Sequence, residues 1–323
     1  MRYPSRTRLT WYIAAAILAA VFAFVRTPYS LIMPGSAIDV RDIVRVDGHE
    51  PPRERYYMTD VTLQESATPA VLLAAFLPGT RVLPTRGLVP QGIGLQQYDK
   101  LMVHAMTESQ TIAAFVAERA AQLPVGILRS HVSIATLDPV SHAKDLLRVG
   151  DAIVAVNGKT VSATIEIQNI LYKIKPGALV SLTFERGGER HNARFATVEL
   201  QGKSRLGVYL LAHLEAPKLP VPVRFKRFDV SGSSGGLMFA LDIYRSIHPY
   251  PAIPLQRIAG TGTIDYGGVV GEIEGTQQKL IAARKAGAQV FLVPRENYHE
   301  VAGTRDIKIV PVHTFAQALG ALL

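Results

Sequence analysis

The feature that most constrains how this 323-residue chain folds is an uncharged stretch near its start. Arg2, Arg6 and Arg8 precede LTWYIAAAILAAVFAFV, residues 9 to 25, and Arg26 follows it. The stretch is at the short end of the roughly 17 to 25 residues that span a bilayer, and slightly longer than the 7 to 15 of a signal-peptide core. Its length therefore fits either kind of segment.

The residues within and beside the stretch favour an uncleaved anchor. An A-x-A cleavage pattern occurs only at Ala14 to Ala16, where a cut would leave most of the apolar segment attached. Burial in a globular core is the alternative, but Trp11 and Tyr12 at one end fit a membrane interface better. Because the arginines favour the inner side, we predict a single-pass cell-membrane protein with a cytoplasmic N-terminus and residues 27 to 323 outside.

The composition describes a folded protein without thiol chemistry. Hydrophobic residues make up 48% of the chain, which is long enough for about two domains. The chain has no cysteine, so disulfides, thiolate zinc sites and a cysteine nucleophile are excluded. The net charge is +9, but the basic residues are scattered and form no stripe interleaved with aromatics. We therefore predict no nucleic-acid partner.

Residues 26 to 123 predict a small α+β region. Prolines and glycines break residues 27 to 65 into short extended pieces. Two helices are expected next, ATPAVLLAAFL at residues 67 to 77 and a longer one from about Leu95 to Ala121. The apolar side chains of the longer helix fit core packing.

Residues 124 to 200 alternate short strands and helices. They contain VGDAIVAVNGK and then a hairpin turning at Gly187 and Gly188. This pattern resembles PDZ domains of bacterial proteases, which bind extended peptides by adding a strand to an exposed sheet edge. The resemblance implies a PDZ-like, β-rich domain; no carboxylate-binding loop is identified, so recognition of a free C-terminus is left open.

Nucleotide and metal chemistry lack their motifs. Residues 158 to 160 read GKT, but Ile153 stands where a phosphate-binding P-loop needs glycine. His49 and His299 are each followed by glutamate, yet the second histidine of an H-E-x-x-H zinc site is missing in both. We predict no ATPase module, no cofactor and no metal.

Residues 231 to 244, SGSSGGLMFALDIY, place a serine where a nucleophile elbow would present it. Gly232, Ser234 and Gly236 fit G-x-S-x-G. Residues 221 to 230 predict a strand that ends at this turn, and the apolar residues after the turn recur at helical spacing. The Ser234 hydroxyl would be exposed there, and N–H groups at the helix start could stabilise an oxyanion.

Two arrangements could activate Ser234. Asp306 and His313 supply the acid-then-histidine order of an α/β-hydrolase, but too little chain follows the serine for that fold. In the second arrangement, Thr276 is the N-cap of a helix and Lys279 lies in its first turn, where the helix dipole opposes its charge. Burial would lower the pKa of this lysine further and make it a general base, whereas a surface lysine is the alternative.

Residues 201 to 323 resemble the proteolytic domain of Lon-type peptidases, which use a Ser-Lys dyad. The segments AGTGTI, QKLIAA and FLVP carry the resemblance together with GSSGG. It implies that Ser234 is the nucleophile, Lys279 the base, and Thr261 the hydroxyl that helps to hold the lysine. The supporting residues of the turn are Gly232, Ser233, Gly235 and Gly236.

The chain departs from the Lon pattern at three positions. Ser233 stands where the family prefers proline, Gly235 where it has alanine, and Glu274 where glycine is usual. Gly235 adds backbone freedom beside the nucleophile, and Ser233 offers a second hydroxyl. We assign Ser234 because it occupies both the elbow centre and the family position.

The whole layout resembles the membrane-anchored PDZ-Lon proteases of bacteria, with a mixed α/β (α+β) fold. The predicted segments are a basic head at 1–8, a transmembrane anchor at 9–25, an α+β region at 26–123, a PDZ-like domain at 124–200 and a Lon-type proteolytic domain at 201–323.

This layout implies an ATP-independent serine endopeptidase that cleaves peptides or unfolded segments outside the cytoplasmic membrane, with the PDZ-like domain positioning the substrate. The expected partners are that substrate and the membrane. A homo-oligomer is also compatible, because Lon-type domains commonly form rings. Two alternatives stay open: a catalytically weak peptide-binding scaffold and a His-dependent serine hydrolase.

Overall fold

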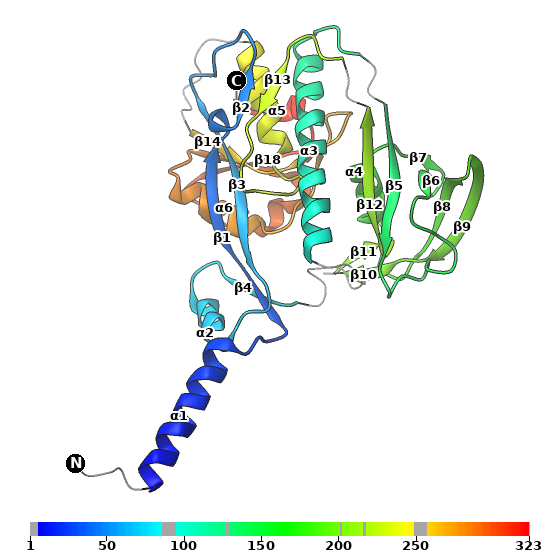
Figure 1. Ribbon diagram of the computed structural model, residues 1–323. Helices are drawn as coiled ribbons and strands as arrows, with labels where there is room; N and C mark the ends of the chain where they lie inside the picture. The colour runs from blue at the N-terminus through cyan, green and yellow to red at the C-terminus, as the bar shows by residue number, and fades with distance from the viewer. Residues whose placement is uncertain are drawn as a thin grey trace.

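The computed structural model describes residues 6–85, 95–126, 129–200, 202–215, 218–248 and 257–322 (Figure 1). Two layered units lie side by side, and helix α1 (Arg6–Phe24) extends away from them. The larger unit contains a six-stranded sheet with helices on both faces, and the smaller contains a second, antiparallel sheet.

The sheet of the larger unit draws its strands from both ends of the chain. Its order is β18-β17-β14-β3-β1-β4. The strands are β1 (Tyr29–Asp39), β3 (Arg55–Gln64), β4 (Arg81–Pro84), β14 (Arg257–Gly260), β17 (Val290–Pro294) and β18 (Lys308–Val312). Strand β14 pairs in parallel with both β3 and β17, so the predicted α+β region and the predicted proteolytic domain share one sheet.

Helices cover the two faces of this sheet. Because side chains alternate along a strand, Val290 and Leu292 of β17 pack with the cluster around α5, whereas Phe291 and Val293 pack with α6. The helices are α3 (Leu95–Ala120), α5 (Gly236–Ile247), α6 (Thr276–Lys285) and α7 (Phe315–Leu322). Helices α3 and α5 therefore lie on one face and α6 on the other.

Short elements connect these layers. They are η1 (Val40–Asp42), β2 (Val44–Val46), α2 (Pro69–Leu72), η2 (Leu73–Phe76), β13 (Val223–Phe225), β15 (Thr263–Ile264), β16 (Val270–Gly271) and η3 (Arg295–Glu300). Strand β13 pairs with β2, and β15 with β16. The predicted helix at residues 67 to 77 is thus a short α-helix continued by a 3-10 turn.

The smaller unit has its own apolar core and the sheet order β12-β5-β6-β8-β9, with β7 paired to β6. The elements are β5 (Arg129–Leu137), β6 (Ala152–Val156), β7 (Lys159–Thr160), α4 (Thr164–Leu171), β8 (Leu179–Arg186), β9 (Glu189–Ala196), β10 (Val198–Leu200), β11 (Lys203–Arg205) and β12 (Val208–Glu215). Gly187 and Gly188 turn the predicted hairpin at φ of 60° and 85°. Strand β12 lies beyond residue 200, where the PDZ-like segment was predicted to end.

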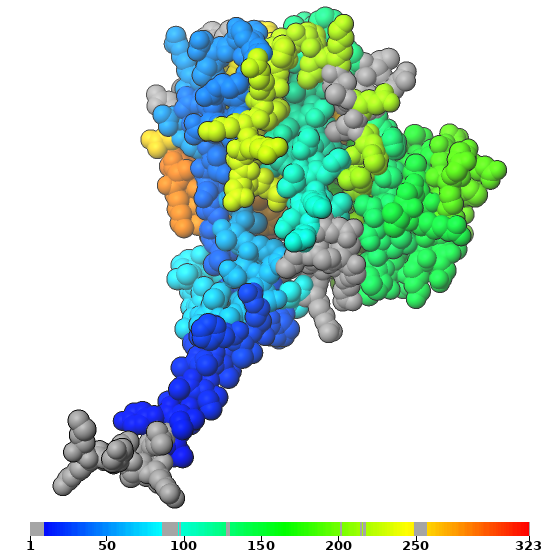
Figure 2. All heavy atoms as spheres, in the orientation of Figure 1, coloured from blue at the N-terminus to red at the C-terminus, as the bar shows by residue number. Residues whose placement is uncertain are grey.

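The predicted N-terminal transmembrane helix is wrong. Within the described chain, no helix has both the length and the apolar character needed to cross a membrane. Helix α1 contains Arg6 and Arg8, and its uncharged part from Leu9 to Phe24 would measure about 24 Å, against a hydrocarbon core of about 30 Å. Figure 2 shows this helix projecting away from both units, with its C-terminal end against α2. Residues 1 to 5 of the predicted basic head lie outside the described residues.

Candidate active site

The loop that carries Ser234 is longer than the predicted elbow. Strand β13 ends at Phe225, and an irregular segment leads from there to the N-terminus of α5, where Gly235 is the N-cap. The predicted strand at residues 221 to 230 is therefore mostly irregular. Gly232 has φ of 94°, a left-handed conformation that favours glycine, so the loop turns sharply just before Ser234.

Helix α3 holds this loop from the side. The hydroxyl of Ser109 donates a hydrogen bond to the carbonyl oxygen of Ser233 at 2.9 Å. The N–H of Gly232 donates to the carbonyl oxygen of Met102, also on α3, at 3.0 Å. A Cβ atom at Gly236 would lie 2.7 Å from Ser109 Oγ, so glycine lets α5 approach α3 this closely. A Cβ atom at Gly235 would lie 3.2 Å from the Phe239 ring.

Sequence analysis assigned α3 to core packing and missed the role of Ser109. This serine is 3% exposed and lies three residues from both Met106 and Ile112, which are buried on the same helix face. A lone hydroxyl within an apolar face was the signal that could have identified it, because a buried hydroxyl needs a partner.

Two N–H groups beside the nucleophile have no hydrogen-bond partner in the described chain, those of Ser234 and Gly235. Because the peptide bond is trans, the bond from Ser109 to the Ser233 carbonyl directs the Ser234 N–H the opposite way. Free N–H groups at the start of a helix suit a developing oxyanion.

The base side begins with a left-handed glycine. Gly275, with φ of 72°, is the N-cap of α6, so the predicted N-cap at Thr276 is wrong. The Thr276 hydroxyl instead donates to Glu300 Oε1 at 3.0 Å. The N–H of Lys279 donates to the Gly275 carbonyl at 3.0 Å, which makes Lys279 the fourth residue of the helix and keeps it in the first turn.

Lys279 is buried, with 4% of its surface exposed. Burial lowers its pKa to about 8, because the charged ammonium loses its hydration. The carboxylates of Glu274 and Asp60 act in the opposite direction and favour the charged form. The surface-lysine alternative therefore does not apply, and a neutral amine is accessible at mildly alkaline pH.

Ser234, Lys279 and Thr261 meet at the carboxyl end of β14. Thr261 directly follows this strand, which lies in the sheet that separates α5 from α6. Lys279 Nζ lies 2.8 Å from Ser234 Oγ and 3.3 Å from Thr261 Oγ1. The Thr261 hydroxyl donates to the Ser234 carbonyl at 3.2 Å, and the Gly262 N–H donates to the same oxygen at 2.8 Å. Thr261 is fully buried, so it fixes the lysine and the nucleophile loop at once.

The histidine arrangement is not formed. His313 Nδ1 lies 3.2 Å from Glu296 Oε1, and His299 Nδ1 lies 2.8 Å from the Glu296 carbonyl oxygen. Asp306 pairs with Arg284 instead of orienting a histidine. In the described ranges, neither histidine has a hydrogen bond to Ser234, and no cluster of three or more histidines or acids could hold a metal.

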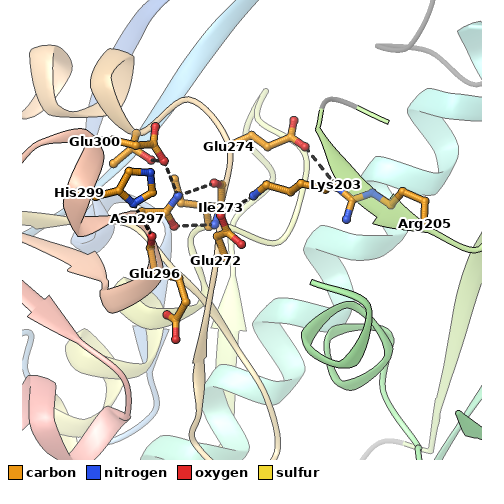
Figure 3. A network of polar contacts seen from close by, with 10 residues as sticks. Lys203, Arg205, Glu272, Ile273, Glu274, Glu296, Asn297, His299 and Glu300 are labelled. Atoms are coloured by element: carbon orange, nitrogen blue, oxygen red, sulfur yellow. Dashed lines mark hydrogen bonds and ion pairs between the residues drawn. The ribbon is translucent and has the colours of Figure 1, made fainter. Parts of the chain in front are cut away.

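The smaller unit contacts the loop that leads to Lys279 (Figure 3). Lys203 of β11 pairs with Glu272, and Arg205 pairs with Glu274 at 3.4 Å. The cationic groups of both residues also lie over the ring of Tyr172, the C-cap of α4, at 4.6 and 4.7 Å from the ring centroid. Residues 272 to 274 are thus a junction between the two units.

Comparison with known families finds two matched regions. Residues 230–323 match the Lon protease (S16) C-terminal proteolytic domain, and residues 125–197 match the PDZ domain. The chain therefore contains Lon-type protease and PDZ regions within a mixed α/β fold.

Two curated relatives are Lon proteases. Lon protease 2 of Bacillus subtilis (strain 168) is 34% identical over 95 residues, 29% of this chain and 17% of that protein. The Lon protease of Xanthomonas oryzae pv. oryzae is 39% identical over 77 residues, 22% of this chain and 9% of that protein. The chain thus spans less than a fifth of the length of either relative.

Among solved structures, the PDZ domain of the SdrC-like protein from Listeria monocytogenes is 21% identical, covering 24% of this chain and 85% of that one. Its TM-score of 0.24 is too low to carry an argument about the fold.

Proposed function

We propose that the protein is an ATP-independent serine endopeptidase that cleaves peptides or unfolded segments with a Ser234–Lys279 dyad. The observation that carries the proposal is the 2.8 Å contact between Ser234 Oγ and the buried amine of Lys279. Hydrolysis of a peptide bond by such a dyad consumes no nucleotide.

The reaction proceeds in two steps. The neutral amine of Lys279 takes the proton of the Ser234 hydroxyl as Oγ attacks the scissile carbonyl. The N–H groups of Ser234 and Gly235 stabilise the oxyanion, and the lysine returns the proton to the leaving nitrogen, which leaves an acyl-enzyme. Water, activated by the same amine, then releases the acyl group and regenerates the serine.

The smaller unit positions an extended substrate through a sheet edge. Strands β12 and β9 form the two ends of its sheet order. Strand β12 is the better candidate, because it lies beside α4 and also contacts α3, the helix that holds the nucleophile loop. His104 of α3 bonds to the Ala212 carbonyl of β12 at 2.6 Å and holds this strand close to the catalytic unit. A peptide would add along the part of the edge that this bond does not occupy.

Cleavage of a fluorescently labelled unfolded protein by the purified chain tests the proposal. Ser234→Ala and Lys279→Met should each abolish cleavage without loss of fold, measured by circular dichroism. Ser233→Ala and His313→Ala are the matched controls and should stay active. Cleavage by Ser234→Ala would refute the nucleophile. An inactive His313→Ala with an active Lys279→Met would establish the histidine hydrolase, and peptide binding without cleavage by the unmodified protein would establish the scaffold.

A further inference from the structure

One buried side chain forms hydrogen bonds to the backbone of the loop that leads into α6 (Figure 3). Asn297 lies in η3 and is fully buried. Its Oδ1 accepts a hydrogen bond from the N–H of Ile273 at 2.9 Å, and its Nδ2 donates to the Ile273 carbonyl oxygen at 2.9 Å. Both backbone polar groups of Ile273 are therefore bound by a single amide.

Glu300 connects Asn297 to Thr276, the first residue of α6. Its Oε1 accepts from Asn297 Nδ2 at 2.7 Å and from the Thr276 hydroxyl at 3.0 Å. The two residues thus hold the chain on both sides of Gly275, the left-handed residue at which the helix begins.

The chemistry of the amide suits this position. An asparagine offers an acceptor oxygen and two N–H donors, and here an N–H, a carbonyl and a carboxylate meet all three. An aspartate would have the same shape but would place its second oxygen against the Ile273 carbonyl and the Glu300 carboxylate. The substitution Asn297→Asp therefore keeps the volume and breaks two of the three bonds.

We propose that Asn297 is a positioning residue for Lys279, acting through the backbone of residues 273 to 276. This inference rests on the proposed dyad. Helix α6 lies on the opposite sheet face from α5, so the 2.8 Å contact between the lysine and Ser234 depends on where α6 begins. Gly275 has no side chain to fix that point, so Asn297 and Glu300 supply the restraint. A displacement of about 1 Å costs on the order of 100-fold in rate.

The test measures kcat and KM of full-length Asn297→Asp on a peptide substrate across pH. We expect kcat to fall by about 30- to 100-fold with KM changed less than about twofold. The acidic limb of the rate profile should move to higher pH, because a displaced amine regains water and its pKa rises. Glu300→Ala removes the bonds to Asn297 Nδ2 and to the Thr276 hydroxyl but leaves both bonds between Asn297 and Ile273, so it should show the same changes in kcat at smaller size.

The matched control is Asn157→Asp in the smaller unit. Asn157 Oδ1 also anchors a backbone N–H, that of Ser181 at 2.9 Å, but it lies in the turn between β6 and β7. This variant should keep the unmodified kcat and pH profile. If Asn297→Asp lowers the melting temperature while its kcat per folded molecule and its acidic limb stay unchanged, Asn297 is only structural and the inference is overturned.

A second measurement separates this inference from the proposed function. The rate of acetylation of Lys279 against pH, followed by peptide mass spectrometry, reports the pKa of the amine without any cleavage assay. A higher pKa in both Asn297→Asp and the uncharged Asn297→Leu than in the unmodified protein supports the positioning role even if Ser234→Ala disproves the dyad. A rise in Asn297→Asp alone would reflect only its added negative charge and would overturn the positioning role. An unchanged pKa overturns the positioning role even if the dyad is established.

Discussion

The two loops that bring Ser234 and Lys279 together are held in different ways. The serine loop is fixed from outside the segment that matches the Lon domain, by Ser109 on α3, a residue 124 positions away in the chain. The lysine loop is fixed from within that segment, by Asn297, 24 positions from Ile273. The serine loop therefore takes one of its supports from the N-terminal part of the fold, whereas the Asn297 support of the lysine loop comes from nearby in the chain.

The electrostatics of the two loops also differ. The serine loop presents unpaired N–H groups, which suit negative charge, and its anchoring bonds are between neutral groups. The lysine loop carries Glu272 and Glu274, which pair with cations of β11 beside the PDZ region. We infer that changes on the serine side alter the rate at every pH, whereas changes on the lysine side also alter the pH dependence.

The largest expected effect comes from fixing the charge of the base. Lys279→Arg places a group that stays protonated at every accessible pH beside Ser234, so no proton can be accepted. We expect kcat/KM to fall by at least about 1,000-fold, with no recovery up to pH 10. Steady-state kinetics from pH 6 to 10 check this. Recovery at high pH would mean that a group other than Lys279 is the base.

Thr261→Val tests the residue that both sides share. The substitution keeps the size and removes the hydroxyl that contacts both the lysine amine and the Ser234 carbonyl. We expect kcat to fall by about 10- to 100-fold, because both groups lose one restraint. Thr261→Ser, which keeps the hydroxyl, is the control. Equal loss in both variants would show that packing of the methyl group matters and that the hydroxyl does not.

Sequence patterns identified the groups that meet, because each lies in a local motif. Ser234 lies in GSSGG, Thr261 in AGTGTI and Lys279 in QKLIAA. The structure brings the hydroxyls of Ser234 and Thr261 within 3.3 Å of Lys279 Nζ. The helix start was misplaced by one residue, since the preference for threonine at an N-cap lost to the left-handed Gly275 and to the bond from Thr276 to Glu300.

The supports of the dyad were not predictable in the same way. Ser109 contacts the loop across 124 positions, and no local pattern records such a pairing. The shared sheet was missed for the same reason, because β3 pairs with β14 across the whole smaller unit. The transmembrane prediction placed Arg6 and Arg8 in a basic head outside the membrane segment, whereas helix α1 begins at Arg6 and includes both arginines.

Ser109→Ala measures the serine side alone. Loss of this hydroxyl leaves the Ser233 carbonyl held by the longer bond from the Gly236 N–H, at 3.3 Å, so the Ser234 N–H points less accurately at the oxyanion. We expect kcat to fall by about tenfold at every pH, with KM and the acidic limb unchanged. Affinity for a peptide boronate, which resembles the tetrahedral intermediate, should fall in parallel. Ser246→Ala is the control, since Ser246 is also buried in a helix but its hydroxyl donates to the Asp242 carbonyl of that same helix. A shifted acidic limb in Ser109→Ala would contradict the separation of the two sides.

Glu274→Gln should have the smallest effect and the most specific one. The carboxylate of Glu274 stabilises the protonated form of Lys279, so its removal lowers the pKa of the amine further below the present value of about 8. The acidic limb of kcat/KM should therefore move to lower pH, and the rate at pH 7 should rise by about two- to threefold while the rate at pH 9 stays the same. Glu272→Gln makes the same charge change on the same loop and also breaks one ion pair to β11, but Glu272 is not among the groups that shift this pKa. If both variants move the limb equally, the effect comes from loosened contact with the smaller unit, and the charge of Glu274 does not tune the base.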